Sequence, residues 1–91
     1  MKKEEVKIIF NNNIIRIEQI KSNGVISPSN FYYDQDETEY VLLEQGSAVI
    51  EFEDHQLNLR SGDHLLIKAH LKHRISYTSE DASWYCIFFK P

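Results

Sequence analysis

Two ionisable side chains, Glu39 and His73, fall at positions where a β-strand would turn them inward. Residues two apart on a strand point to the same face. His73 therefore shares its face with Ile75 and Tyr77, the less polar side of its segment, and Glu39 shares its face with Val41. A buried carboxylate or imidazole costs free energy unless it is paired, hydrogen-bonded or bound to a metal. The pattern predicts a polar site inside an apolar core.

Short runs rich in β-branched and aromatic residues, separated by turn residues, predict the elements that position these groups. No segment shows helical spacing over a useful length, and the N-terminal segment 2–10 reads either as a short helical turn or as an edge strand. A further extended stretch is expected to start at 31–33. The expected strands are 14–22, 39–44, 47–53, 56–60, 64–67, 73–78 and 83–90.

Residues 27–90 resemble the small single-domain cupins, and the first of two shared motifs lies around Glu39. The family's motif has two histidines one residue apart, then three or four residues, a glutamate, six further residues and a glycine. Glu39 and Gly46 match the second half of this motif. Tyr33 and Gln35 stand at the two histidine positions, an arrangement that is similar to a recurring variant among small cupins.

The second cupin motif corresponds to residues 62–73, from its first glycine, Gly62, to its ligand position, His73. Lys68, His70 and Tyr77 replace the motif's proline, second glycine and asparagine. The resemblance implies an all-β fold, a single-domain cupin-type β-barrel of the jelly-roll, double-stranded β-helix kind.

Two hypotheses account for polar groups inside such a barrel. In the first, a divalent metal is held by the His73 nitrogen, the Glu39 carboxylate and the Gln35 carbonyl oxygen, with Tyr33 or water completing the shell. Imidazole and carboxylate ligands suit Zn, Fe, Ni or Mn. In the second, Gln35 bridges Glu39 and His73 by hydrogen bonds without an ion. His70, in the loop before the strand that starts at His73, and Tyr33 and Tyr77 are additional candidate pocket residues.

The same resemblance leaves two functions open. The first is a small-molecule-binding barrel, with or without a weakly bound divalent metal at its mouth. The alternative is a metal-dependent cupin enzyme of the isomerase, lyase or dioxygenase type, in which Glu39 and His73 position the metal or act as an acid–base pair on a small polar substrate. Because the first motif lacks both histidines, we favour binding.

Length and composition set the remaining expectations. Ninety-one residues predict one domain over 1–91, with a barrel at 13–91 and an N-terminal segment at 1–12 whose apolar residues predict a homodimer contact. A net charge of −4 argues against nucleic acid as a partner. The absence of a long apolar run argues against a membrane span. The lone Cys86 excludes an internal disulfide and favours a cytoplasmic location.

Overall fold

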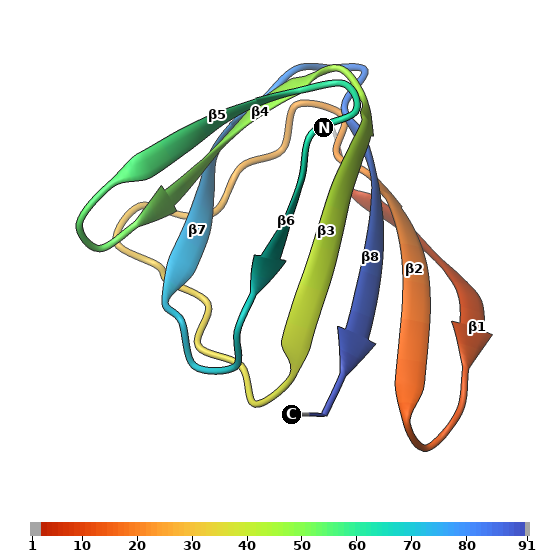
Figure 1. Cartoon of the computed structure of the whole chain (residues 1–91). Coiled ribbons are helices and arrows are strands. Elements are labelled where there is room, and N and C mark those ends of the chain that lie inside the picture. The colour runs from red at the N-terminus through yellow and green to blue at the C-terminus, as the bar shows by residue number, and fades with distance from the viewer. Residues whose placement is uncertain (1–2, 91) are drawn as a thin grey trace.

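The computed structural model describes residues 3–90, which form eight β-strands in two antiparallel sheets and no helix (Figure 1). The five-stranded sheet has the order β1-β2-β8-β3-β6, and the three-stranded sheet has the order β5-β4-β7. The strands are β1 (Glu5–Asn11), β2 (Ile15–Lys21), β3 (Thr38–Gln45), β4 (Ser47–Phe52), β5 (Gln56–Arg60), β6 (His64–Ile67), β7 (His73–Thr78) and β8 (Ser83–Phe89).

The all-β cupin-type fold expected from the sequence is confirmed, and every expected strand is present with its ends moved by at most one residue. The N-terminal segment is an edge strand, since β1 pairs with β2. The extended stretch expected from 31–33 is not a strand; it contributes one isolated bridge between Tyr33 and His73. Within residues 3–90, no helix has the length and apolar character that crossing a membrane requires.

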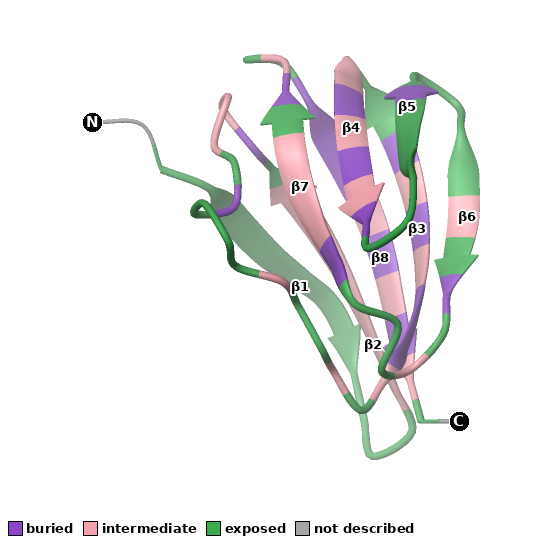
Figure 2. Cartoon of the chain, turned by 90° about the vertical axis from the view of Figure 1, so that its left-hand side faces the viewer, coloured by how far each residue is buried: buried purple, intermediate pink, exposed green. Residues whose placement is uncertain are grey.

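The core lies between the two sheets and follows the alternation of the strands. In β4, Ala48, Ile50 and Phe52 are buried, and the residues between them are half-buried, which gives the banded pattern in Figure 2. On the opposing sheet, β3 pairs with β8 so that Val41 lies opposite Cys86. Both side chains are buried, so the inward faces of β3, β8 and β4 together form one apolar core.

The turn between β3 and β4 depends on Gly46. Its φ of +86° lies in the left-handed region that side-chain-bearing residues rarely adopt. A Cβ at this position would also lie 2.8 Å from the Cα of Ala82, which is closer than atoms pack. The glycine of the first motif is therefore required by the backbone and by its neighbour, and it does not contact the cavity.

The long loop between β2 and β3 runs beside the free edge of β7 (Figures 1 and 2). The Ser27 amide donates to the carbonyl of Ile75 at 2.9 Å, and the Ile75 amide donates to the Ser27 hydroxyl at 3.0 Å. Further along, Tyr33 and His73 exchange two backbone hydrogen bonds, of 2.6 and 3.2 Å. The loop thus closes the side of the barrel between the two sheets and carries Tyr33 and Gln35 to its wall.

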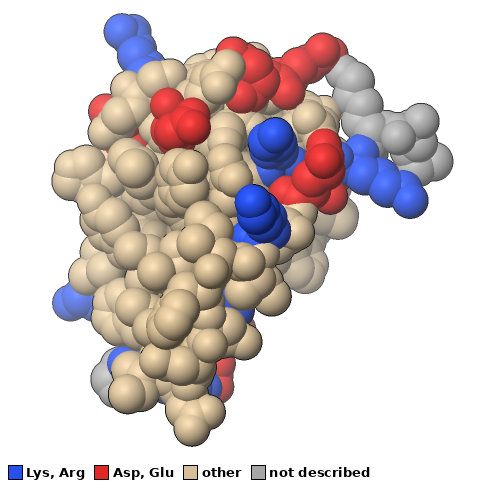
Figure 3. Space-filling model, turned by 90° about the vertical axis from the view of Figure 1, so that its right-hand side faces the viewer, with Lys and Arg blue, Asp and Glu red and all other residues tan. Residues whose placement is uncertain are grey.

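Strand β1 lies beyond the edge of the three-stranded sheet, and all seven of its residues are exposed (Figure 2). Val6, Ile8, Ile9 and Phe10 are each about half exposed, and Ile14 in the following turn is 74% exposed. Figure 3 shows the side of the molecule on which β1 and β2 lie. There, a broad area without charged side chains extends below a group of charged ones. The β1–β2 hairpin therefore leaves apolar side chains in contact with solvent.

Candidate functional site

A cavity of about 150 Å³ lies inside the barrel. Its walls are mainly apolar and come from both sheets, with Ile20, Val41, Ile50, Ile67, Ile75, Trp84, Cys86 and Phe88 as contributors. Its polar lining residues are Glu4, Ser22, Tyr33, Gln35, Glu39 and His73. The cavity therefore combines an apolar body with a small number of polar groups, which is the usual composition of a small-molecule site.

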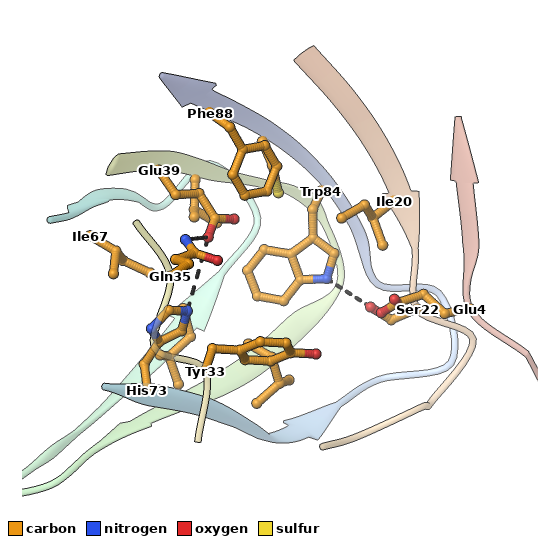
Figure 4. Close-up of a pocket in the computed structure, with 14 residues that line it drawn as sticks. Glu4, Ile20, Ser22, Tyr33, Gln35, Glu39, Ile67, His73, Trp84 and Phe88 are labelled. Carbon is orange, nitrogen blue, oxygen red and sulfur yellow. Dashed lines mark hydrogen bonds and ion pairs between the residues drawn. The ribbon is translucent and has the colours of Figure 1, made fainter. Parts of the chain in front are cut away.

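Glu39, His73 and Gln35 meet at one end of this cavity (Figure 4). The Gln35 amide nitrogen donates to the Glu39 carboxylate Oε1 at 3.1 Å. His73 Nε2 lies 4.0 Å from the same oxygen, which is too long for a hydrogen bond. Glu39 and His73 are both buried residues. The structure thus brings together three residues from the loop, β3 and β7, with a gap between carboxylate and imidazole.

The orientation of the His73 ring is set by the backbone of the preceding loop. Nδ1 lies 2.8 Å from the carbonyl oxygen of Leu71. A carbonyl oxygen can only accept, so Nδ1 carries the proton and donates it. In the neutral ring, Nε2 then has a free lone pair, and this atom faces the cavity and Glu39 (Figure 4).

The Glu39 carboxyl group lies in surroundings that disfavour its charge. Burial raises the pKa of Glu39 above its ordinary value, and the charge of Glu18 adds to the rise. Hydrogen bonds from Gln35 and Cys86 and the proximity of His73 oppose it without reversing it. The same burial, together with Glu39, strongly raises the pKa of the Cys86 thiol, so Cys86 is a neutral wall residue and hydrogen-bond donor.

The aromatic rings of Tyr33, Trp84 and Phe88 line the cavity beside its polar residues (Figure 4). Tyr33 packs against His73 with ring centroids 5.5 Å apart. The pKa of the Tyr33 hydroxyl is raised by burial and by the carboxylates of Glu4 and Glu39. Trp84 is held in place because its indole nitrogen donates to the Ser22 hydroxyl at 2.8 Å (Figure 4).

Two of the additional pocket candidates lie outside the cavity. His70 is exposed, pairs with Asp34 through a 2.8 Å contact, and has a φ of +65°, the left-handed conformation that suits the motif's glycine. Tyr77 is 48% exposed. The expectation that Tyr77 shares the inward face of His73 is wrong because β7 has a bulge: Ile50 pairs with Ile75 and Val49 with Tyr77, so one residue of β7 is unpaired and the alternation reverses.

Sequence reasoning did not assign Glu4, Ser22 or Cys86 to the site. Glu4 precedes β1, and Ser22 follows β2, so their positions at the cavity depend on the pairing of this hairpin. Cys86 reaches Glu39 because β8 pairs with β3. No local signal in the sequence announces these pairings.

The donor set at the polar end fits a divalent metal only weakly. Two metal bonds of about 2.1 Å span at most about 4.2 Å, so His73 Nε2 and Glu39 Oε1 lie within reach of one ion. Protein metal sites use at least three strong ligands. Across residues 3–90, no group of three or more His, Cys, Asp and Glu side chains is arranged to hold a metal ion. Gln35 also turns its amide nitrogen, not its oxygen, toward Glu39.

The small barrel with a mixed apolar and polar cavity has the cupin-type fold. Residues 31–91, which are 61 of the 91 residues, match the family of AraC-like ligand binding domains. The chain therefore belongs to this family of ligand-binding domains. A search of curated proteins finds no match.

Several solved structures are similar to this chain in fold. A "putative mannose-6-phosphate isomerase" from Ralstonia eutropha is 32% identical, with a TM-score of 0.94 over 100% of this chain and 88% of that one. A cupin superfamily protein from Desulfitobacterium hafniense has a TM-score of 0.82 at 20% identity, over 98% of this chain and 79% of that one. KdgF from Halomonas sp. also has a TM-score of 0.82, at 17% identity, over 97% and 81% of the two chains. The last two likenesses concern the fold alone.

Proposed function

We propose that this chain holds a small molecule in the barrel cavity, with Gln35, Glu39 and His73 contacting the polar part of the ligand. The observation that carries the proposal is the cavity of about 150 Å³, whose walls are mainly apolar and whose polar residues gather at one end as Gln35, Glu39 and His73 and beside Trp84 as Ser22 and Glu4 (Figure 4). An engineered cavity of about this volume in another protein admits benzene. The buried part of the ligand is expected to be of that size.

Trp84 provides a direct test, because it lines the cavity and is the single tryptophan of the chain. Small fragments of mixed charge and polarity are titrated while the fluorescence of Trp84 is recorded, and calorimetry checks each hit. At least one fragment is expected to change the emission saturably. A collection that leaves the emission unchanged up to about 10 mM, where even a Kd of about 1 mM would be visible, contradicts the proposal.

A matched pair of substitutions places the binding inside the barrel. Val41→Phe adds volume to the cavity wall, whereas Leu42→Phe adds the same ring one residue along β3, on the other face. Overpacking costs about 1–3 kcal/mol, so melting curves first establish that both variants fold. Val41→Phe is expected to weaken fragment binding at least about tenfold, and Leu42→Phe is expected to leave it within about twofold. Equal losses would mean that the fragments bind elsewhere.

A metal-dependent cupin enzyme of the isomerase, lyase or dioxygenase type, acting on a small polar substrate, is the second candidate. It is favoured by the facing lone pairs of His73 Nε2 and Glu39 Oε1, 4.0 Å apart. Zn, Fe, Ni or Mn would bind these two atoms, with water completing the shell, and would act as a Lewis acid. Metal analysis of untagged protein, compared with His73→Ala, tests this. Stoichiometric metal that is lost in the variant would support it, and equal trace amounts in both would oppose it.

Isomerisation of a sugar phosphate, named for the Ralstonia protein, has less support in this chain. A phosphate group needs Lys, Arg or a cluster of backbone amides beside it. Among the fourteen residues that line the cavity, none is Lys or Arg, and Glu4 and Glu39 are both acidic. The ligand proposal therefore does not extend to that substrate.

We also propose that residues 1–91 act as one domain that dimerises through β1. Strand β1 has an unpaired edge and apolar side chains that are about half exposed on both faces. A second copy fits this edge because antiparallel pairing centred on Val6 would set Glu5 opposite Lys7 of the other copy, and Lys7 opposite Glu5. Opposite charges across a strand pair are favourable, and such pairing makes a closed twofold dimer.

A further inference from the structure

The polar end of the cavity presents acceptors to whatever lies between them. Glu39 Oε1 is a carboxylate oxygen, and in the neutral His73 ring Nε2 carries a free lone pair because Nδ1 donates to the Leu71 carbonyl. The two atoms face each other across 4.0 Å. A ligand nitrogen about 2.8 Å from each would subtend an angle of about 90°, which suits a group with more than one N–H. A ligand group that satisfies both acceptors at once must therefore carry at least two donor hydrogens.

The charge of the lining has one sign. Glu39 and Glu4 both line the cavity, and no Lys or Arg does. The guanidinium of Arg16 lies 4.3 Å from the centre of the Phe88 ring, which belongs to the wall. Arg16 is held outside by ion pairs with Glu18 at 2.8 Å and Glu37 at 3.1 Å. A cationic ligand would meet favourable charge in this cavity, whereas an anionic ligand would be repelled.

The remaining walls suit a cation with an apolar substituent. The rings of Tyr33, Trp84 and Phe88 surround the space in front of Glu39 (Figure 4). Aromatic faces attract ammonium groups, and more strongly where water is excluded. The same rings pack against hydrocarbon, so the polar and apolar parts of such a ligand both find partners.

We infer that the ligand is a small primary amine, whose ammonium group donates to the Glu39 carboxylate and His73 Nε2 while its hydrocarbon part lies among Tyr33, Trp84 and Phe88. This inference rests on the proposed binding function and adds the chemical class of the ligand. It also explains why a carboxylate is kept in a buried position that disfavours it: the cation of the ligand supplies the missing partner.

Three probes of equal shape and different charge test the inference. Benzylamine, benzyl alcohol and benzoate are titrated by Trp84 fluorescence and calorimetry at pH 7.5, with a chelator present so that no metal contributes. Benzylamine is expected to bind at least about tenfold more tightly than benzyl alcohol, and benzoate is expected not to bind at all. In Glu39→Gln, the affinity for benzylamine should fall at least about tenfold relative to that for benzyl alcohol, so that the preference for the amine disappears. Glu44→Gln, an exposed glutamate of the same strand outside the cavity lining, should retain the preference.

The outcomes separate the ligand class from the binding function. If benzyl alcohol or benzoate binds as tightly as benzylamine, the inference is overturned and the binding function stands. If none of the three binds but other fragments change the emission of Trp84, the inference is again overturned alone. If nothing binds, both fail. An amine preference that survives in Glu39→Gln would show that the ammonium group lies elsewhere and would also overturn the inference.

Discussion

At the scale of the residue, Glu39 is the most informative group in the molecule. It is a carboxyl group in a largely apolar wall, with one amide donor, one thiol donor and an imidazole that stops short of a hydrogen bond. Groups held in unfavourable surroundings cost stability and are common at functional sites. Its position therefore predicts that removing its charge stabilises the fold.

Glu39→Gln is expected to raise the free energy of unfolding at neutral pH. Burial raises the pKa of Glu39 above its ordinary value of 4.5, so the folded chain binds more protons than the unfolded chain. Stability contributed by this group is then present below pH 4.5 and is lost as the pH rises through the raised pKa. The Glu39→Gln variant has no carboxyl group at this position, so its free energy of unfolding does not fall in this way as the pH rises. Urea titrations at pH 4 and pH 7 should show a gain that is larger at pH 7.

Glu44→Gln is the control for that experiment, since Glu44 is exposed on the same strand. It should change the stability by less than about 0.5 kcal/mol at both pH values. A Glu39→Gln variant that is less stable than the unmodified protein at pH 7 would contradict the argument. It would mean that the hydrogen bonds to the carboxylate outweigh its desolvation.

At the scale of the element, the turns decide how the strands meet. Gly46 and Gly62 both have positive φ, +86° and +94°. They differ in their surroundings: a Cβ at Gly46 would approach Ala82 to 2.8 Å, and a Cβ at Gly62 would meet nothing within 4 Å. The two glycines therefore form a natural pair for separating backbone strain from overpacking.

Gly62→Ala is expected to destabilise the fold by about 1–2 kcal/mol, the cost of a left-handed conformation. Gly46→Ala should cost that amount and about 1–3 kcal/mol more, because the added methyl group has no room. Chemical denaturation of the two variants measures the difference. Similar values for both would mean that the loop around Ala82 moves aside without cost.

At the scale of the whole molecule, the five-stranded sheet is wider than the sheet that faces it. The β1–β2 hairpin therefore keeps its apolar residues in water in a single chain.

Light scattering at micromolar concentration is expected to give twice the mass of one chain. Ile8→Lys should reduce this to one chain, because a charge on β1 opposes burial of the strand. Leu66→Lys on β6, with 51% exposure against 55% for Ile8, is the matched control and should remain a dimer. A monomer mass for the unmodified protein would rule the dimer out.

Much of the fold followed from local patterns along the chain. Ala48, Ile50 and Phe52 alternate with Ser47, Val49 and Glu51, of which only Val49 is apolar, and Gly46 and Gly62 separate strands where φ must be positive. These are local properties of the backbone and of one strand face, so one sequence was enough to predict them. The stretch 31–33 has the same β-forming composition, yet it makes a single bridge because the loop follows the edge of β7 for only one pair.

The candidate site was predictable in composition and not in geometry. The alternation of side chains along a strand indicated that Glu39 and His73 face inward, and both are buried. The same alternation gave the wrong face for Tyr77, because β7 has a bulge where it pairs with β4. The residues of β7 alone do not indicate this bulge. The partners Ser22 and Cys86 come from strand pairings across more than forty residues, which periodicity does not encode.

The amino-acid sequence by itself determined the strands, their turns and the chemical character of the cavity, because these follow from side-chain alternation and backbone freedom over a few residues. The tertiary structure alone decided that His73 Nε2 stops 4.0 Å from Glu39, that Cys86 and Gln35 contact the same carboxyl group, and that Tyr77 turns outward. Distances between side chains on different strands depend on register, bulges and loop paths. Those are fixed only when the sheets pack against each other.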